Sequence, residues 1–210
     1  MRLFVALDID SGIRERISQF ISEIRSFAPS ARWVSAESLH ITLKFIGEQS
    51  PPRIEEIKRV LAIVRGTPPN LKFRGTGFFP NPGRPRVFCV GVEADAGLPA
   101  LANRVDEALA ALGLPGEERG FSPHLTLARG GDSRHPSGGS GNPRPLPGDK
   151  PNRSFARLQE RLGQLPATEF GVMTAENFFL YESNLSSSGA HYTKLARFPL
   201  TLDYLLVARD

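Results

Sequence analysis

Hydrophobic and polar residues alternate along several short stretches of this chain, a pattern that indicates β-strands with one buried face. Residues 2–9 form the first stretch, and Leu39-His40-Ile41-Thr42-Leu43 repeats the pattern most clearly. The same reasoning predicts strands at residues 71–79, 86–93, 123–127 and 178–181, with a short extended piece at 32–34. In the stretch at 39–43 the three aliphatic residues face a core, and the histidine and threonine share the opposite face.

Between these strands, apolar residues recur at helical spacing and predict amphipathic helices. The first helix begins at Asp10 or Ser11 and ends before Pro29, and the second begins at Ser50 with two prolines in its first turn. A third ends at Gly113, and a fourth covers residues 155–162. With 210 residues the chain is long enough for one good core, so the pattern predicts a single α+β domain.

The two halves of the chain repeat one another. A constant offset, equal to the separation of His124 from His40, carries Arg-Leu-Phe at 2–4 onto Arg-Val-Phe at 86–88, and Leu-His-Ile-Thr-Leu at 39–43 onto Pro-His-Leu-Thr-Leu at 123–127. The offset grows by 16 after Arg129, where residues 130–152 hold 11 Gly or Pro among 23 residues. We therefore expect residues 1–210 to form one two-lobed domain with pseudo-twofold symmetry and a flexible loop at 130–152. Each lobe is expected to be a mostly antiparallel sheet with outer helices.

The two His-x-Thr motifs contain the candidate catalytic residues. Each places an imidazole beside a hydroxyl on the open face of a buried strand: His40 with Thr42, and His124 with Thr126. Two such strands facing a central groove would form a symmetric acid–base site. A histidine on a strand is more often a structural hydrogen-bonding residue, and His191-Tyr192-Thr193 also matches the bare pattern. Because His191 has no partner at the constant offset, we expect it to lie outside the site.

The amino-acid composition and charge restrict the classes of function that this protein could have. The formal net charge is +4 and Arg outnumbers Lys by 21 to 5, which suits phosphate-bearing ligands, although genomic composition bias would produce the same content. The single cysteine, Cys89, excludes a disulfide framework and a cysteine-rich metal site. The histidines form no His-x-x-x-His pair, so we expect no metal and no cofactor. No signal segment or membrane span is predicted, so we expect a cytoplasmic protein.

These segments, taken in order along the chain, resemble the bacterial and archaeal RNA 2′,3′-cyclic phosphodiesterases, also called 2′-5′ RNA ligases, of the two-histidine phosphoesterase superfamily. The resemblance is carried by Arg-Leu-Phe-Val-Ala-Leu at 2–7, Trp-Val at 33–34, Leu-His-Ile-Thr-Leu-Lys-Phe-Ile-Gly at 39–47, Phe-Ser-Pro-His-Leu-Thr-Leu-Ala-Arg at 121–129, Tyr-Glu-Ser at 181–183 and Leu-Ala-Arg-Phe-Pro-Leu at 195–200. The chain departs from the family in the insertion after Arg129.

The resemblance implies a two-lobed enzyme that opens the 2′,3′-cyclic phosphate of RNA ends and leaves a 2′-phosphate without a metal. As partners we expect RNA with such an end, with tRNA fragments as one candidate source, and we expect a monomer. The resemblance also implies that His40 is the proton donor and His124 the proton acceptor. Thr42 and Thr126 are implied to bind the phosphate.

Two basic residues near the motifs are further candidates for phosphate binding. Lys44 is expected on the same strand face as His40, and Arg129 lies just past the second motif; a structural role is the alternative for both. Phe45, Phe79 and Phe121 are candidate base-stacking surfaces, with core packing as the alternative.

Three other functions stay open at this point. The same site could join RNA ends through a 2′-5′ linkage, or act on another small cyclic phosphate. A non-catalytic RNA-end-binding module is the third alternative, but such a module needs no matched acid and base. Turnover of a 2′,3′-cyclic end in EDTA would separate an enzyme from a binding module.

Overall fold

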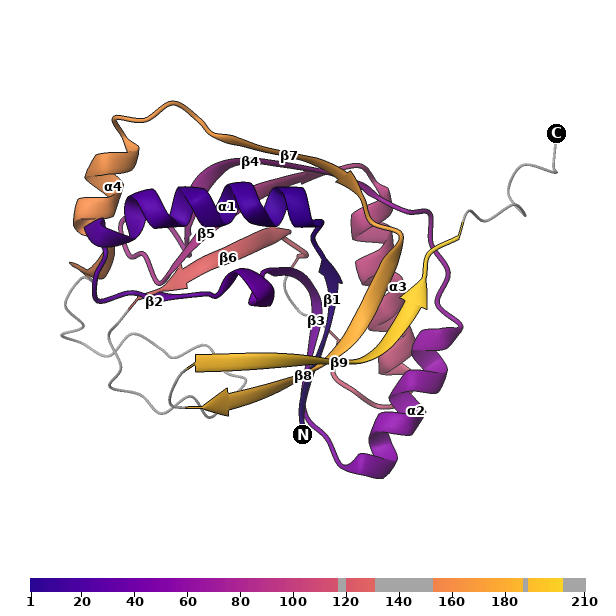
Figure 1. The fold of residues 1–210 in the computed structure, drawn as a ribbon. Coiled ribbons are helices and arrows are strands. Elements are labelled where there is room, and N and C mark those ends of the chain that lie inside the picture. The colour runs from indigo at the N-terminus through magenta and orange to yellow at the C-terminus, as the bar shows by residue number, and fades with distance from the viewer. Residues whose placement is uncertain (117–119, 131–152, 187–188, 202–210) are drawn as a thin grey trace, which may run out of the picture.

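The computed structural model describes residues 1–116, 120–130, 153–186 and 189–201, so the expected loop at 130–152 lies, apart from Gly130, outside the described residues. Within them the chain forms one nine-stranded sheet and four α-helices, and Figure 1 shows the curled arrangement. The strands are β1 (Arg2–Asp8), β2 (Arg32–Trp33), β3 (His40–Glu48), β4 (Asn70–Phe79), β5 (Val87–Ala94), β6 (His124–Arg129), β7 (Glu169–Thr174), β8 (Asn177–Ser186) and β9 (Gly189–Pro199). The helices are α1 (Ser11–Ile24), α2 (Pro51–Ala62), α3 (Gly97–Ala110) and α4 (Ala156–Leu162).

The helices form where the apolar spacing predicts them. The buried residues of α1 are Ile13, Ile17, Phe20, Ile21 and Ile24, the expected stripe. Asp10 caps α1, because its Oδ1 accepts a hydrogen bond of 2.8 Å from the backbone N–H of Ile13. At the other expected boundary, Gly113 follows α3 with a φ of 75°, a left-handed conformation that glycine adopts without steric cost. None of the helices in the described segments is long and apolar enough to cross a membrane.

The strand order is β7-β4-β5-β6-β3-β1-β8-β9, with β2 beside β6 and every pairing antiparallel. Counted outward from the centre, β6, β5, β4 and β7 mirror β3, β1, β8 and β9. The expected α+β fold with an antiparallel sheet is confirmed, and the order has the twofold character that the sequence repeat predicts.

The structure differs from the expected lobes in two respects. The strands form one continuous sheet rather than one sheet per lobe, because β3 and β6 pair at the centre. The sequence halves also exchange a strand: β4 pairs with β5, and β8 pairs with β1. Strands β7 and β9, which the alternation did not predict, complete the two outer edges of the sheet.

The sheet has one face in the core and one open face. On β1, the side chains of Leu3, Val5 and Leu7 are fully buried in the main core together with the helix stripes. Phe4 and Ala6 point the other way and join a separate apolar cluster with Tyr181. Because neighbours along a strand face opposite sides, this second cluster marks the open face, on which the candidate site lies.

Candidate active site

The two motif strands are neighbours at the centre of the sheet. Strand β3 begins at His40 and β6 begins at His124, and the strands pair antiparallel through Ile41 and Leu125. The side chains of Ile41 and Leu125 are fully buried in the core. The two His-x-Thr motifs therefore lie side by side on the open face.

Both imidazoles are held in the same way. The Nδ1 atom of His40 lies 2.7 Å from the carbonyl oxygen of Ser38, and that of His124 lies 2.9 Å from the carbonyl oxygen of Ser122. A carbonyl oxygen only accepts hydrogen bonds, so Nδ1 carries the proton in each neutral ring. This arrangement leaves Nε2 of each histidine to accept or donate a proton.

Aromatic rings support both histidines from the side. The ring centroid of Phe4 is 4.7 Å from that of His40, and the ring of Tyr192 meets His40 edge-on at 5.0 Å. The ring of Phe79 lies 4.7 Å from that of His124. Tyr192 belongs to β9 and is a site residue that the sequence reasoning missed; it appears there only as the residue next to His191.

The electrostatic environment of His40 is distinctive. Burial lowers its pKa from 6.5 to about 4; the Ser38 carbonyl and Asp8 act in the opposite direction, whereas Arg129 and His124 add to the lowering. In the ligand-free protein His40 is therefore neutral at pH 7. An anion bound beside it would favour the charged form, because an opposite charge stabilises imidazolium.

Lys44 does not share the face of His40, which corrects the expectation from simple alternation. Ala6 pairs with Thr42 and Val5 with Lys44, so Leu43 is an extra residue and β3 has a β-bulge there. Lys44 is only 4% exposed and points to the helix side. Its Nζ forms an ion pair with Asp106 and a hydrogen bond of 2.6 Å to the carbonyl of Pro115. These contacts occupy its ammonium group away from the motifs.

Arg129 is on the open face for the same geometric reason. In the second motif Cys89 pairs with Thr126 and Phe88 with Ala128, so Leu127 is the extra residue of a matching bulge. The bulge turns Ala128 into the core and Arg129 toward the site, where its side chain is exposed. Arg129 lies within electrostatic range of Arg2 and Arg32, which strengthens the positive potential beside the motifs.

The remaining candidates divide between the two faces. His191 pairs with Asn184 and is the strand neighbour of Tyr192, so it points away from His40, as expected. Phe45 is 61% exposed on the open face, whereas Phe121 packs against the main core. Among the residues described by the structure, no three His, Cys, Asp or Glu side chains gather as a metal-binding group.

Comparison with known proteins places these features in a family. A family model described as LigT-like phosphoesterase matches residues 7–89. An RNA 2′,3′-cyclic phosphodiesterase of Archaeoglobus fulgidus is 33% identical over 198 residues, which cover 94% of this chain and 99% of the relative. A second relative of the same name, from Methanothermobacter thermautotrophicus, is 31% identical and covers 95% of this chain and 99% of its own.

A solved structure agrees with the sequence comparisons. E. coli LigT in complex with 3′-AMP superimposes with a TM-score of 0.69 at 28% identity, covering 95% of this chain and 98% of LigT. The resemblance inferred from segments along the sequence is thus confirmed over nearly the whole chain. The chain belongs to the LigT-like phosphoesterase family, alongside these RNA 2′,3′-cyclic phosphodiesterases.

Proposed function

We propose that this protein hydrolyses the 2′,3′-cyclic phosphodiester at RNA ends to a 2′-phosphomonoester, with His40 and His124 as general acid and general base. The observation that carries the proposal is the pairing of β3 with β6, in which the two His-x-Thr motifs are neighbours and both histidines are held in the same way. The names of the relatives support the reaction type, and the 3′-AMP in LigT supports a ribonucleotide as ligand. RNA ends of tRNA fragments are among the candidate substrates.

In the proposed reaction, Nε2 of His124 takes a proton from a water molecule, which attacks the phosphorus atom. The bond between phosphorus and the ribose O3′ breaks, and Nε2 of His40 donates a proton to that oxygen. The products are a 2′-phosphate and a free 3′-hydroxyl. The family resemblance assigns the two roles, and positioned proton transfer contributes roughly 10²–10⁴-fold to a rate.

The remaining groups of the site suit the charge that develops on the phosphate. The hydroxyls of Thr42 and Thr126 are assigned to the non-bridging oxygens, which become more negative in the transition state. Because the strands are antiparallel, each threonine lies on the side of the histidine of the other motif. Arg129 adds a guanidinium that can bind phosphate oxygens in a bidentate manner. An acid, a base and a cation are thus supplied by side chains, and we propose that the reaction needs no metal.

The test is an RNA oligonucleotide with a 2′,3′-cyclic end, incubated with the protein in excess EDTA. Mass spectrometry should show the gain of one water, and ³¹P NMR should place the phosphate on the 2′ oxygen. Retention of the RNA without turnover would instead support an end-binding module. Activity that EDTA abolishes and a divalent ion restores would overturn metal independence.

The reverse reaction is measured in the same experiment. Addition of a second RNA with a free 5′-hydroxyl would show a longer product if the site joins ends through a 2′-5′ linkage. Hydrolysis is expected to dominate, because water is in large excess over any RNA end. The His124→Ala variant serves as the inactive control for both directions.

A further inference from the structure

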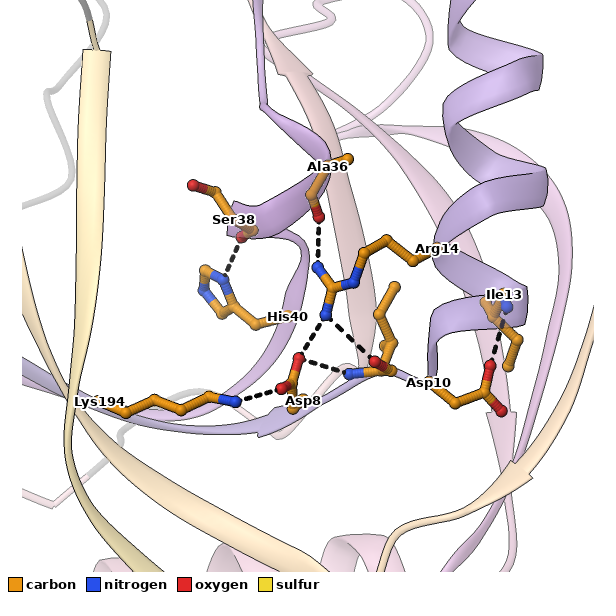
Figure 2. A network of polar contacts seen from close by, with 9 residues as sticks. Asp8, Asp10, Ile13, Arg14, Ala36, Ser38, His40 and Lys194 are labelled. Atoms are coloured by element: carbon orange, nitrogen blue, oxygen red, sulfur yellow. Dashed lines mark hydrogen bonds and ion pairs between the residues drawn. The ribbon is translucent and has the colours of Figure 1, made fainter.

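His40 is surrounded by a charged network that begins on the neighbouring strand. Asp8 is its cross-strand partner, so the carboxylate and the imidazole share the open face. The Oδ1 atom of Asp8 accepts hydrogen bonds of 2.6 Å from Nη2 of Arg14 and 2.9 Å from the backbone N–H of Ile9. Its Oδ2 atom accepts one of 2.5 Å from Nζ of Lys194 (Figure 2).

Arg14 connects this carboxylate to the turn that holds the His40 ring. Its Nη1 atom donates to the carbonyl of Ala36, the first residue of the 3₁₀ turn Ala36–Ser38. Ser38, the last residue of that turn, provides the carbonyl that accepts from Nδ1 of His40. Figure 2 shows Arg14 between Asp8 and Ala36, with the turn leading to the imidazole. One guanidinium thus ties the acceptor of His40 to strand β1.

Among the residues that the structure describes, the second motif has no equivalent of this network. The cross-strand partner of His124, in the place that Asp8 has beside His40, is Gly91, and at the constant offset Arg14 corresponds to Leu98. Leu98 is fully buried in the core, and neither residue carries a charge. The motifs are alike in backbone and hydrogen bonding, but within the described part of the chain only the first has an ion pair beside its histidine. The twofold symmetry is therefore broken at the position that would distinguish an acid from a base.

We propose that Asp8 and Arg14 form a positioning unit that holds His40 as its Nδ1–H tautomer and stabilises its imidazolium, which makes His40 the proton donor and leaves His124 the base. The assignment of acid and base rests on the function proposed above; the effect on the tautomer and charge of His40 does not. Neither Asp8 nor Arg14 reacts with substrate in this proposal.

The other charged groups around His40 explain why a carboxylate is needed there. Arg129 and His124 from the β6 side disfavour a positive charge on the ring, and so does burial. Arg14 from α1 and Lys194 from β9 are cations as well, but both are bound to Asp8.

Burial raises the pKa of the nearby Tyr181 phenol, so this group adds no charge beside the ring at pH 7. Among the described residues, Asp8 is the carboxylate that favours the imidazolium. A bound phosphate would then place a second anion beside the same ring.

Two variants and a matched control test the unit in the full-length protein. Asp8→Asn keeps the shape and an accepting oxygen but removes the charge. Arg14→Gln removes the link to Ala36. Arg16→Gln is the control, because Arg16 lies on the same helix but donates to the carbonyl of Phe170 on β7, away from the motifs. Histidine ¹⁵N–¹H NMR measures tautomer and titration without substrate, and kcat/KM is measured from pH 5 to 8 on the cyclic RNA end.

The titration of His40 should move to lower pH by roughly one unit in Asp8→Asn, the smallest effect typical of losing an opposite charge nearby. That of His124 should not move. In Arg14→Gln the Nδ1–H tautomer of His40 should become mixed, and Arg16→Gln should match wild type. On the pH plateau, kcat/KM should fall about 3- to 10-fold in Asp8→Asn, because the protonated acid becomes rarer.

Three results would overturn the proposal. An unchanged His40 titration in Asp8→Asn would show that the carboxylate does not act on the ring. An equal shift at His124 would show a general effect rather than a unit specific to His40. If the titration of His40 shifts and kcat/KM stays unchanged, His40 would be the base. A base acts in its neutral form, so removing the carboxylate charge of Asp8 would not lower the rate. If wild type fails to open the cyclic end at all, the proposed function fails, and the NMR results still decide the positioning role.

Discussion

Ile41 of β3 and Leu125 of β6 are direct antiparallel partners, and through this pair the two halves of the sheet meet. Both side chains are fully buried, so the residues on either side of each must face the open side of the sheet. Those residues are the histidines and threonines of the two motifs. One buried aliphatic pair thus brings together four polar groups, two from each half of the chain.

Replacing either motif histidine should remove most of the activity. His40→Ala and His124→Ala are each expected to lower kcat on a 2′,3′-cyclic end by roughly 10²–10⁴-fold, because each removes one positioned proton transfer. The double variant should lose much less than the product of the two losses, since the histidines act as a unit. Steady-state kinetics on all three variants measures this.

His191→Ala is the matched control for those variants. His191 is exposed on β9 and points away from the motifs, so its removal should leave kcat near wild type. Loss of activity equal to that of His40→Ala, or full turnover by His124→Ala, would contradict the two-motif site.

Replacing Arg129 should lower activity with little effect on stability, whereas replacing Lys44 should lower stability with little effect on activity. Arg129→Ala is expected to lower kcat/KM by about 10²-fold, the scale for losing one donor to a developing oxyanion. Its exposed side chain should contribute less than about 0.5 kcal/mol to the free energy of unfolding. Lys44→Met should do the reverse and cost about 1–3 kcal/mol, because it removes a buried partner of Asp106.

Urea denaturation and kinetics on the same two preparations check this pair. A folded Lys44→Met variant whose kcat/KM falls as far as that of Arg129→Ala would contradict this account, because it would show that Lys44 acts in the site.

His40 should make the fold sensitive to acid. The unfolded chain binds a proton on His40 as the pH falls through 6.5, whereas the folded protein does so only near pH 4. Between those values the unfolded state holds more protons, so this contribution to stability is present at pH 7 and is lost as the pH falls. Between pH 7 and 4.5, wild type should lose on the order of 2 kcal/mol more than His40→Gln. Urea midpoints at the two pH values test this, and an identical pH dependence in both proteins would contradict it.

Gly91 should be intolerant of any side chain. It pairs with His124, and a Cβ there would lie 2.7 Å from the backbone oxygen of Arg74, closer than real contacts allow. Gly91→Ala should therefore displace β5 from β4 and destabilise the fold by about 1–3 kcal/mol, with a loss of kcat because His124 moves too. Gly77→Ala is the control, because its Cβ would meet only the Sγ of Cys89 at 3.9 Å. Equal melting temperatures of the two variants would argue against this packing account.

Much of this site could be predicted from the local pattern of apolar and polar residues along the chain. Alternation and helical spacing depend on which face a few consecutive residues present, so they predicted six of the strands, the four helices and the outward direction of His40 and His124. The constant offset between the two halves paired the two motifs and set His191 aside. Residue types within one strand were enough for these inferences, because a buried face selects apolar side chains at every second position.

Other features depend on contacts between distant segments, and no local pattern reports them. The exchange of β4 and β8, and the arrival of Tyr192 and Lys194 beside His40, follow from which strand edges pair. The bulges are the clearest case: one extra residue in β3 turned Lys44 into the core, and one in β6 turned Arg129 out to the site. A bulge does not change the residue types of a strand; it changes only the register of that strand against its neighbour. The pairing of strands in the folded sheet therefore decides that Lys44 and Arg129 lie on opposite faces.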